Sequence, residues 1–215
     1  LVIATAPAGI ARRLRATGRV KRLRHAAAYA IPAGGGHDLA LDPEAPVLER
    51  ESLDLVLSLF DLALVNDLPG ALRHIRAALR PGGLLLAALP GRGSLRELRA
   101  AWALADTEAH GAPQPRVAPF VDIRQMGTLL QLAGFADPVV DVEPVTLRHR
   151  DALALMRELK ALGWSNPLRE RPRTLVTRRL LATAAAAYEA AHADDDGKVR
   201  ASFHILHVFA RAPMS

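Results

Sequence analysis

The sequence predicts a doubly wound α/β fold with a mostly parallel sheet, an antiparallel last strand and a helical insertion before that strand. Two observations support this fold class. Apolar segments of strand length alternate with amphipathic segments of helical length along the chain. In addition, residues 84–89 are uniformly apolar, as in a strand that is buried on both faces of a parallel sheet. We expect residues 1–215 to form a single domain with the insertion at 150–192.

The first half of the chain contains three expected strands. Residues 1–5 form a short apolar run, and a helix is expected over 8–17 because it ends at Gly18. A second strand is expected at 20–24 and a third at 37–41, after a glycine-rich loop.

The middle of the chain gives the clearest signals. Residues 53–59 predict a strand, and Asp67 with Pro69 predicts the start of a helix over 68–79. The remaining elements are expected as helices at 94–110 (capped by Ser94), 122–132, 151–162 (capped by Asp151) and 174–192 (Leu175, Leu180 and Leu181 facing the core), and as strands at 139–147 and 199–211.

Composition excludes several classes of protein. Half of the residues are hydrophobic and 23% are charged, which argues against disorder. No apolar run reaches the roughly 18–20 residues of a transmembrane helix. The absence of cysteine excludes disulfides, thiolate metal sites and a cysteine nucleophile. Because Leu1 already lies in an apolar run, we expect upstream sequence to be missing, and a bacterial cytoplasm and a mitochondrial matrix are both compatible locations.

The net charge of +6 is distributed unevenly. Residues 1–36 contain no acid, and a second basic cluster runs from 148 to 179. The first cluster consists of Arg12, Arg13, Arg15, Arg19, Lys21, Arg22 and Arg24. Basic clusters bind nucleic acid or anionic membranes, so peripheral membrane association remains open. Aromatic residues make up only 4% of the chain, which disfavours a nucleic-acid partner that relies on base stacking.

Two neighbouring segments resemble a known family. Residues 52–58 (SLDLVLS) and 79–86 (LRPGGLLL) resemble the fourth and fifth strands of class I, S-adenosylmethionine-dependent methyltransferases. Further segments resemble the methyltransferase-domain assembly factors of respiratory complex I and their α-proteobacterial relatives, whose eukaryotic member is regarded as an arginine hydroxylase. These segments are 65–72, 116–122, 130–135, 155–160 and 200–207.

The resemblance carries several implications. It implies a Rossmann-like sheet of seven strands, S-adenosylmethionine as the cofactor, and a protein partner that is a complex I subunit or assembly intermediate. The assembly-factor family is in turn more distantly similar to the malonyl-carrier methyltransferase of biotin synthesis.

The cofactor motifs of the resembled family are largely missing. That family ends its first strand with an acid and a glycine-rich turn, but here only Gly9 fits, and Pro7 restricts the backbone. The second strand should end in an acid for the ribose hydroxyls, and residues 20–28 contain none. Asp42 lies where the family places the acid that faces adenine, although it also fits a plain loop acid. The expected cofactor residues are therefore Gly9, Asp42 and backbone groups near Leu59.

Two functional hypotheses follow. The first is a non-catalytic assembly factor or accessory subunit that binds a protein partner and has an eroded cofactor site. The second is an active methyltransferase or arginine hydroxylase that acts on a protein, and no catalytic residue is assigned to it. No metal site is expected, because His204 and His207 point to opposite faces of a strand. Residues 194–197 (DDDG) lack the following glutamate of a calcium loop and predict a turn.

Overall fold

A computed structural model describes residues 2–5, 8–28, 38–42, 46–164, 166, 169, 171–172 and 175–214. The strands are β1 (Val2–Thr5), β2 (Leu23–Ala28), β3 (Leu39–Leu41), β4 (Leu53–Leu59), β5 (Leu79–Pro90), β6 (Ala136–His149) and β7 (Val199–Arg211). The helices are α1 (Ala8–Ala16), the 3₁₀ helix η1 (Asp61–Leu64), α2 (Leu68–Ala78), α3 (Arg96–His110), α4 (Ile123–Leu132), α5 (Ala152–Ala161) and α6 (Arg178–His192).

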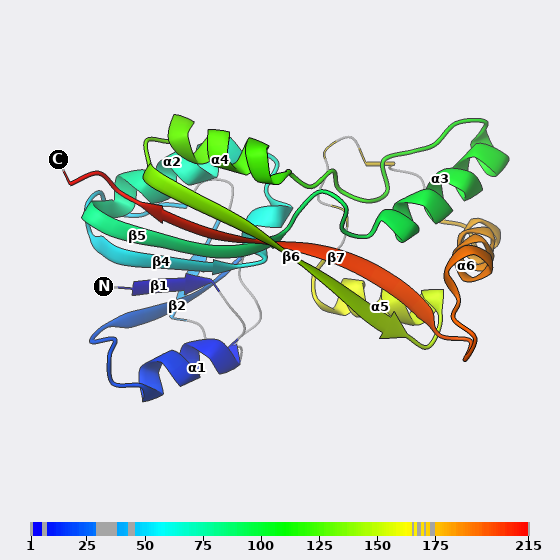
Figure 1. The fold of residues 1–215 in the computed structure, drawn as a ribbon, viewed down its shortest axis with the longest axis horizontal. Helices are drawn as coiled ribbons and strands as arrows, with labels where there is room; N and C mark the ends of the chain where they lie inside the picture. The colour runs from blue at the N-terminus through cyan, green and yellow to red at the C-terminus, as the bar shows by residue number, and fades with distance from the viewer. Residues whose placement is uncertain are drawn as a thin grey trace. The chain divides into compact units, whose positions relative to one another are not determined.

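The strands form one seven-stranded sheet in the order β3-β2-β1-β4-β5-β7-β6 (Figure 1). Strands β1 to β5 pair in parallel, and β7 pairs with β5 in the antiparallel direction. The predicted α/β sheet with an antiparallel last strand is therefore confirmed. Strand β1 has β2 on one side and β4 on the other, so the strand order reverses there. In doubly wound sheets this reversal opens a crevice at the carboxyl ends of the strands, where ligands bind.

The chain divides into two compact units. The first unit contains Leu1–Pro90, Val121–Glu143 and Ile205–Ser215, and the second contains Gly91–Phe120 and Pro144–His204. The segment 150–192, expected as an insertion, lies in the second unit. Strands β6 and β7 contribute residues to both units.

The core of the first unit forms where helices cover the sheet. Helices α2 and α4 pack side by side, and α1 lies beside β2 (Figure 1). The apolar residues of α2 recur at helical spacing, so Leu72 and Ile75 are both buried against the sheet. Met126 and Leu130 of α4 are fully buried in the same cluster.

In the second unit α6 packs against both α3 and α5. Tyr188 of α6 is fully buried, and its hydroxyl donates to the carbonyl of Arg200 on β7 at 2.7 Å. That bond satisfies a polar group which would otherwise be costly to bury. None of the described helices has both the length and the hydropathy that crossing a membrane requires.

Three predicted helix starts are confirmed by their caps. The Asp67 carboxylate accepts from the backbone N–H of Gly70 at 2.8 Å, and that of Asp151 accepts from Ala154 at 2.6 Å. Asp122 and Gln125 form a reciprocal capping box at α4.

Other boundaries differ from the prediction. Strand β2 begins at Leu23 rather than at residue 20, because its pairing with β1 starts where Leu23 lies opposite Val2. Helix α6 begins at Arg178, where Thr177 supplies the cap, and Leu175 is 93% exposed rather than in the core. Ser94 does not cap α3. Its hydroxyl is buried and accepts from the backbone N–H of His204 at 2.9 Å.

Candidate cofactor site

The candidate site lies at the carboxyl edge of the parallel strands. Thr5 ends β1 and lies opposite Ser58 of β4, and Leu41 ends β3 opposite Ala28 of β2. The register therefore brings the ends of β1, β2, β3 and β4 to one edge. Because the strand order reverses at β1, this edge is the expected binding crevice of the fold.

Gly9 lies in the first turn of α1, directly beyond this edge. A Cβ atom added to Gly9 would meet no atom within 4 Å in the described part of the chain. Packing of the described residues therefore does not explain why residue 9 is glycine, and the space above it is open. Pro7, which the sequence offers as an obstacle in the preceding turn, lies outside the described residues.

Asp42 follows β3 directly and is exposed at the same edge. Asp42 therefore lies directly after the third strand, as expected from the sequence, and its role as a contact for the cofactor stays a prediction. Leu59, the last residue of β4, also lies at this edge.

The residue after Leu59 has an unusual backbone conformation. Phe60 has φ of 73° and ψ of −15°, and its backbone N–H donates to the carbonyl of Ala88 at 2.7 Å. A bulky side chain in the left-handed region costs about 1–3 kcal/mol, and such strain clusters at functional sites. The sequence gives no signal for this conformation, because phenylalanine is not a turn residue.

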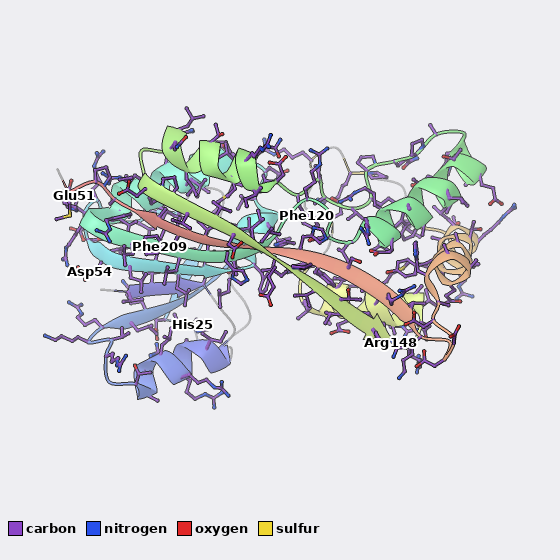
Figure 2. All side chains as sticks on the ribbon, in the orientation of Figure 1. His25, Glu51, Asp54, Phe120, Arg148 and Phe209 are labelled. Atoms are coloured by element: carbon purple, nitrogen blue, oxygen red, sulfur yellow. The ribbon has the colours of Figure 1, made fainter. Side chains whose placement is uncertain are left out.

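Asp61 begins η1 beside Phe60. Burial raises the pKa of its carboxyl, and the hydrogen bond from Thr5 together with the charge of nearby His25 partly opposes that effect. His25 itself is buried on β2, next to α1 (Figure 2). The edge between β1 and β4 thus carries a partly desolvated carboxyl group. Its position directly after a strand at the reversal of strand order is the signal that could have identified it from sequence.

The carboxyl end of β2 has no acid. The strand finishes with three alanines, and the next acid along the chain is Asp38. Asp38 lies just before β3, beside His25 in the middle of β2. Its carboxylate accepts from the backbone N–H of His25 at 2.7 Å and pairs with Arg15. The hydrogen bond from His25 is the main reason that the pKa of Asp38 is lowered. This carboxylate therefore has a structural role, because its hydrogen bonds join β2, α1 and the start of β3.

The described residues fit only part of S-adenosylmethionine. Asp42 is the candidate contact for the adenine, whereas β2 ends in alanines and offers no carboxylate for the ribose hydroxyls.

Leu59 also lines an apolar hollow of about 390 Å³ on one face of the sheet, over β4, β5, β7 and β6. Leu57, Leu86 and Phe209 contribute to it, and Phe209 is labelled on β7 in Figure 2. At its margin, His207 Nε2 lies 3.0 Å from Glu143 Oε2, so this histidine is engaged in a pair. Among the described residues there is no group of three side chains able to hold a metal ion.

Residues 14–139 match the family described as "Methyltransferase domain". The malonyl-[acyl-carrier protein] O-methyltransferase of Xylella fastidiosa is 42% identical over 164 residues, which cover 76% of this chain and 53% of that protein. The mitochondrial arginine-hydroxylase NDUFAF5 of Danio rerio is 36% identical over 172 residues, which cover 80% of this chain and 53% of that protein. The chain thus spans about half the length of these curated relatives.

Solved structures share the fold. A methyltransferase-like protein from Bacillus halodurans aligns with a TM-score of 0.61 at 12% identity, covering 99% of this chain and 91% of its own. The YcgJ protein of Bacillus subtilis aligns with a TM-score of 0.60 at 9% identity, covering 100% of this chain and 92% of its own. At such low identity these structures support the architecture alone.

Proposed function

This chain belongs to the methyltransferase domain family, and from that premise we propose that it acts by binding a protein partner rather than by transferring a methyl group. The fold provides the crevice in which class I enzymes seat S-adenosylmethionine. In this proposal the chain keeps the fold of the family but lacks some of the side chains that bind S-adenosylmethionine.

One observation carries this proposal. Strand β2 ends in alanines, and the first acid after it, Asp38, is bound beside the middle of β2 by the backbone N–H of His25 and by Arg15. A ribose bound at the carboxyl edge would leave its two hydroxyls without the bidentate carboxylate acceptor that this fold normally supplies. Hydrogen bonds to a charged group contribute about 1.5–3 kcal/mol, so their loss weakens binding at least tenfold.

The proposed partner is a subunit or assembly intermediate of respiratory complex I. The likeness to the mitochondrial arginine-hydroxylase NDUFAF5 supports this choice. The proposed setting is a mitochondrial matrix or a bacterial cytoplasm, since the relatives include mitochondrial and bacterial proteins.

Calorimetric titration of the full chain with S-adenosylmethionine, and separately with S-adenosylhomocysteine, tests the incomplete seat. We expect no saturable heat and no thermal shift for either ligand up to millimolar concentration. A dissociation constant in the micromolar range would contradict the proposal.

The partner is tested by capture of purified complex I assembly intermediates on the immobilised chain. The control is an immobilised methyltransferase of the same fold from outside this group of relatives. We expect retention on this chain alone, and equal recovery from both supports would refute the choice of partner.

A second candidate is an active enzyme that acts on a protein substrate, as a methyltransferase or an arginine hydroxylase. The strained Phe60 beside the partly desolvated Asp61 favours it, because strain and shifted pKa values gather at working sites. On this candidate Gly9, Asp42 and the backbone near Leu59 hold the cofactor.

Substitution of Asp42 separates the two candidates. In an active enzyme, Asp42→Ala abolishes both cofactor binding and turnover, whereas the exposed Glu49→Gln leaves both unchanged. Unchanged cofactor binding in Asp42→Ala would remove this residue from the site.

A further inference from the structure

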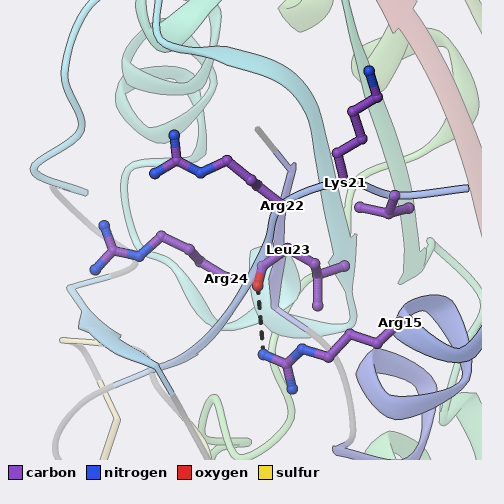
Figure 3. A pocket seen from close by; sticks show the side chains of 6 residues that line it. Arg15, Lys21, Arg22, Leu23 and Arg24 are labelled. Carbon is purple, nitrogen blue, oxygen red and sulfur yellow. Dashed lines mark hydrogen bonds between the residues drawn. The ribbon is translucent and has the colours of Figure 1, made fainter. Parts of the chain in front are cut away.

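The end of α1, the following turn and the start of β2 form a basic surface, which consists of Arg12, Arg13, Arg15, Arg19, Lys21, Arg22 and Arg24. All seven side chains are exposed. Four of them, Arg15, Lys21, Arg22 and Arg24, line a surface hollow of about 470 Å³ (Figure 3). The guanidinium of Arg15 is fixed there by the carbonyl of Leu23, at 3.4 Å, and by Asp38.

The other six cations have no carboxylate partner within the described ranges. Among the residues that the structure describes, Asp38 is the acid that reaches this surface, and it pairs with Arg15. Cations near the end of α1 are stabilised by the helix dipole, which accounts for Arg13 and Arg15. Lys21, Arg22 and Arg24 lie beyond the last turn of the helix, where the dipole no longer acts. Figure 3 shows Arg22 and Arg24 projecting to the same side, as expected for residues two apart on an extended chain.

The side chains between the cations indicate what kind of ligand fits. Stable protein interfaces need a buried apolar or aromatic centre. None of the exposed large hydrophobic side chains lies within 8–28, and no aromatic residue occurs there. The stretch 8–24 also lacks the asparagine and glutamine side chains that read adenine edges, and the aromatic rings on which single strands stack. What remains is a surface recognised by charge alone.

We propose that this basic surface docks on a membrane that contains anionic phospholipids. Clusters of four to eight Lys or Arg residues on an amphipathic element are typical of such contacts. The planar guanidinium groups match phosphate oxygens in bidentate geometry, and the hollow beside β2 provides room for a head group.

The position of the surface leaves the candidate cofactor site accessible. The basic surface surrounds the amino end of β2, whereas Asp42 and Leu59 lie at the carboxyl edge of the same sheet. Docking at one end therefore does not cover the other. The basic surface and the candidate cofactor site share no residue, so substitutions in one leave the other unchanged.

Flotation of the full chain with vesicles tests the proposal. The probes are pure phosphatidylcholine vesicles and phosphatidylcholine vesicles with about one third phosphatidylglycerol. We expect binding to the anionic vesicles alone, and we expect it to weaken as salt is raised. Each cation at such a surface changes binding about fivefold, so Arg22→Gln/Arg24→Gln should weaken it about 25-fold.

A matched pair controls for net charge. Arg73→Gln/Arg124→Gln removes two exposed cations from α2 and α4 of the same unit and should bind like the unmodified chain. Thermal unfolding of both variants checks that each is folded. The proposal is overturned if both pairs lose the same affinity, if neutral vesicles bind equally well, or if duplex DNA at equal phosphate concentration binds more tightly than the vesicles.

Discussion

At the scale of single residues, two neighbours at the carboxyl edge are held in unfavourable states. Phe60 has a left-handed backbone, and the carboxyl of Asp61 is partly desolvated. Each state costs free energy that the surrounding fold supplies. Such costs are typical of sites retained for binding or chemistry, so this edge is where we expect substitutions to stabilise the fold and impair function together.

The substitution Asp61→Asn should stabilise the protein at neutral pH. A carboxyl whose pKa is raised on folding favours the folded state at low pH, and this contribution is lost as the pH rises through its folded pKa. The ionised carboxylate therefore destabilises the folded state at pH 7. Its removal should raise the free energy of unfolding by on the order of 1 kcal/mol. Urea unfolding at neutral pH and below pH 4 measures the difference, which should vanish at the acidic pH.

The exposed Glu49→Gln serves as the control and should change little at either pH. A lower free energy of unfolding for Asp61→Asn at pH 7 would show that its hydrogen bond with Thr5 outweighs its burial.

The sequence could predict only part of the candidate site. The acid after the third strand and the end of the fourth strand follow from strand order, so Asp42 and Leu59 lie at the expected edge. The conformation of Phe60 could not be predicted, because it depends on the bond from its N–H to Ala88 on the neighbouring strand. The burial of Asp61 likewise depends on contacts with β1 and β2 that no local pattern encodes.

At the scale of elements, local sequence patterns predict where a helix exists better than they predict its first and last residues. Asp67 and Asp151 cap where expected, because a cap needs only its own first turn. Asp122 also caps α4, at the expected start of that helix. Ser94 has the same local pattern but bonds to β7, more than a hundred residues away. The expected start of α6 at residue 174 is also wrong, because Thr177 caps the helix and the local pattern does not distinguish this threonine as the cap.

Helix α3 depends on one buried ion pair. Both oxygens of Asp106 accept from Arg116 at 2.7 Å, and the two side chains are 0% and 8% exposed. The guanidinium also lies 5.0 Å from the centre of the Trp102 ring. Asp106→Asn leaves this cation buried without a countercharge, so we expect a loss of about 3–5 kcal/mol in urea unfolding.

An exposed ion pair provides the comparison. Arg80 and Asp54 approach to 2.8 Å, but both side chains are about half exposed. Asp54→Asn should therefore change stability by less than about 1 kcal/mol. Equal losses for the two variants would show that burial does not decide the strength of these pairs.

At the scale of the whole molecule, two compact units share two strands. Strands β6 and β7 each contribute residues to both units, so unfolding either unit disrupts strands of the other. This continuity supports our proposal that residues 1–215 behave as a single domain.

The two tryptophans allow a test of that proposal. Trp102 and Trp164 both belong to the second unit, so fluorescence reports on that unit, whereas far-ultraviolet circular dichroism reports on all helices and strands. We expect the two signals to give the same midpoint in urea, and Asp106→Asn to lower both midpoints together. A second transition seen by circular dichroism alone would mean that the first unit unfolds independently.

The terminal position of β6 in the sheet bears on how the protein avoids self-association. An open edge presents unpaired N–H and C=O groups, which can pair with a strand of another chain. Strand β6 contains Pro138 and Pro144, which have no N–H to donate to an added strand. Asp141 and Glu143 add negative charge between them. This edge is thus poorly suited to sheet extension between copies, which protects a chain with a long exposed strand from aggregation.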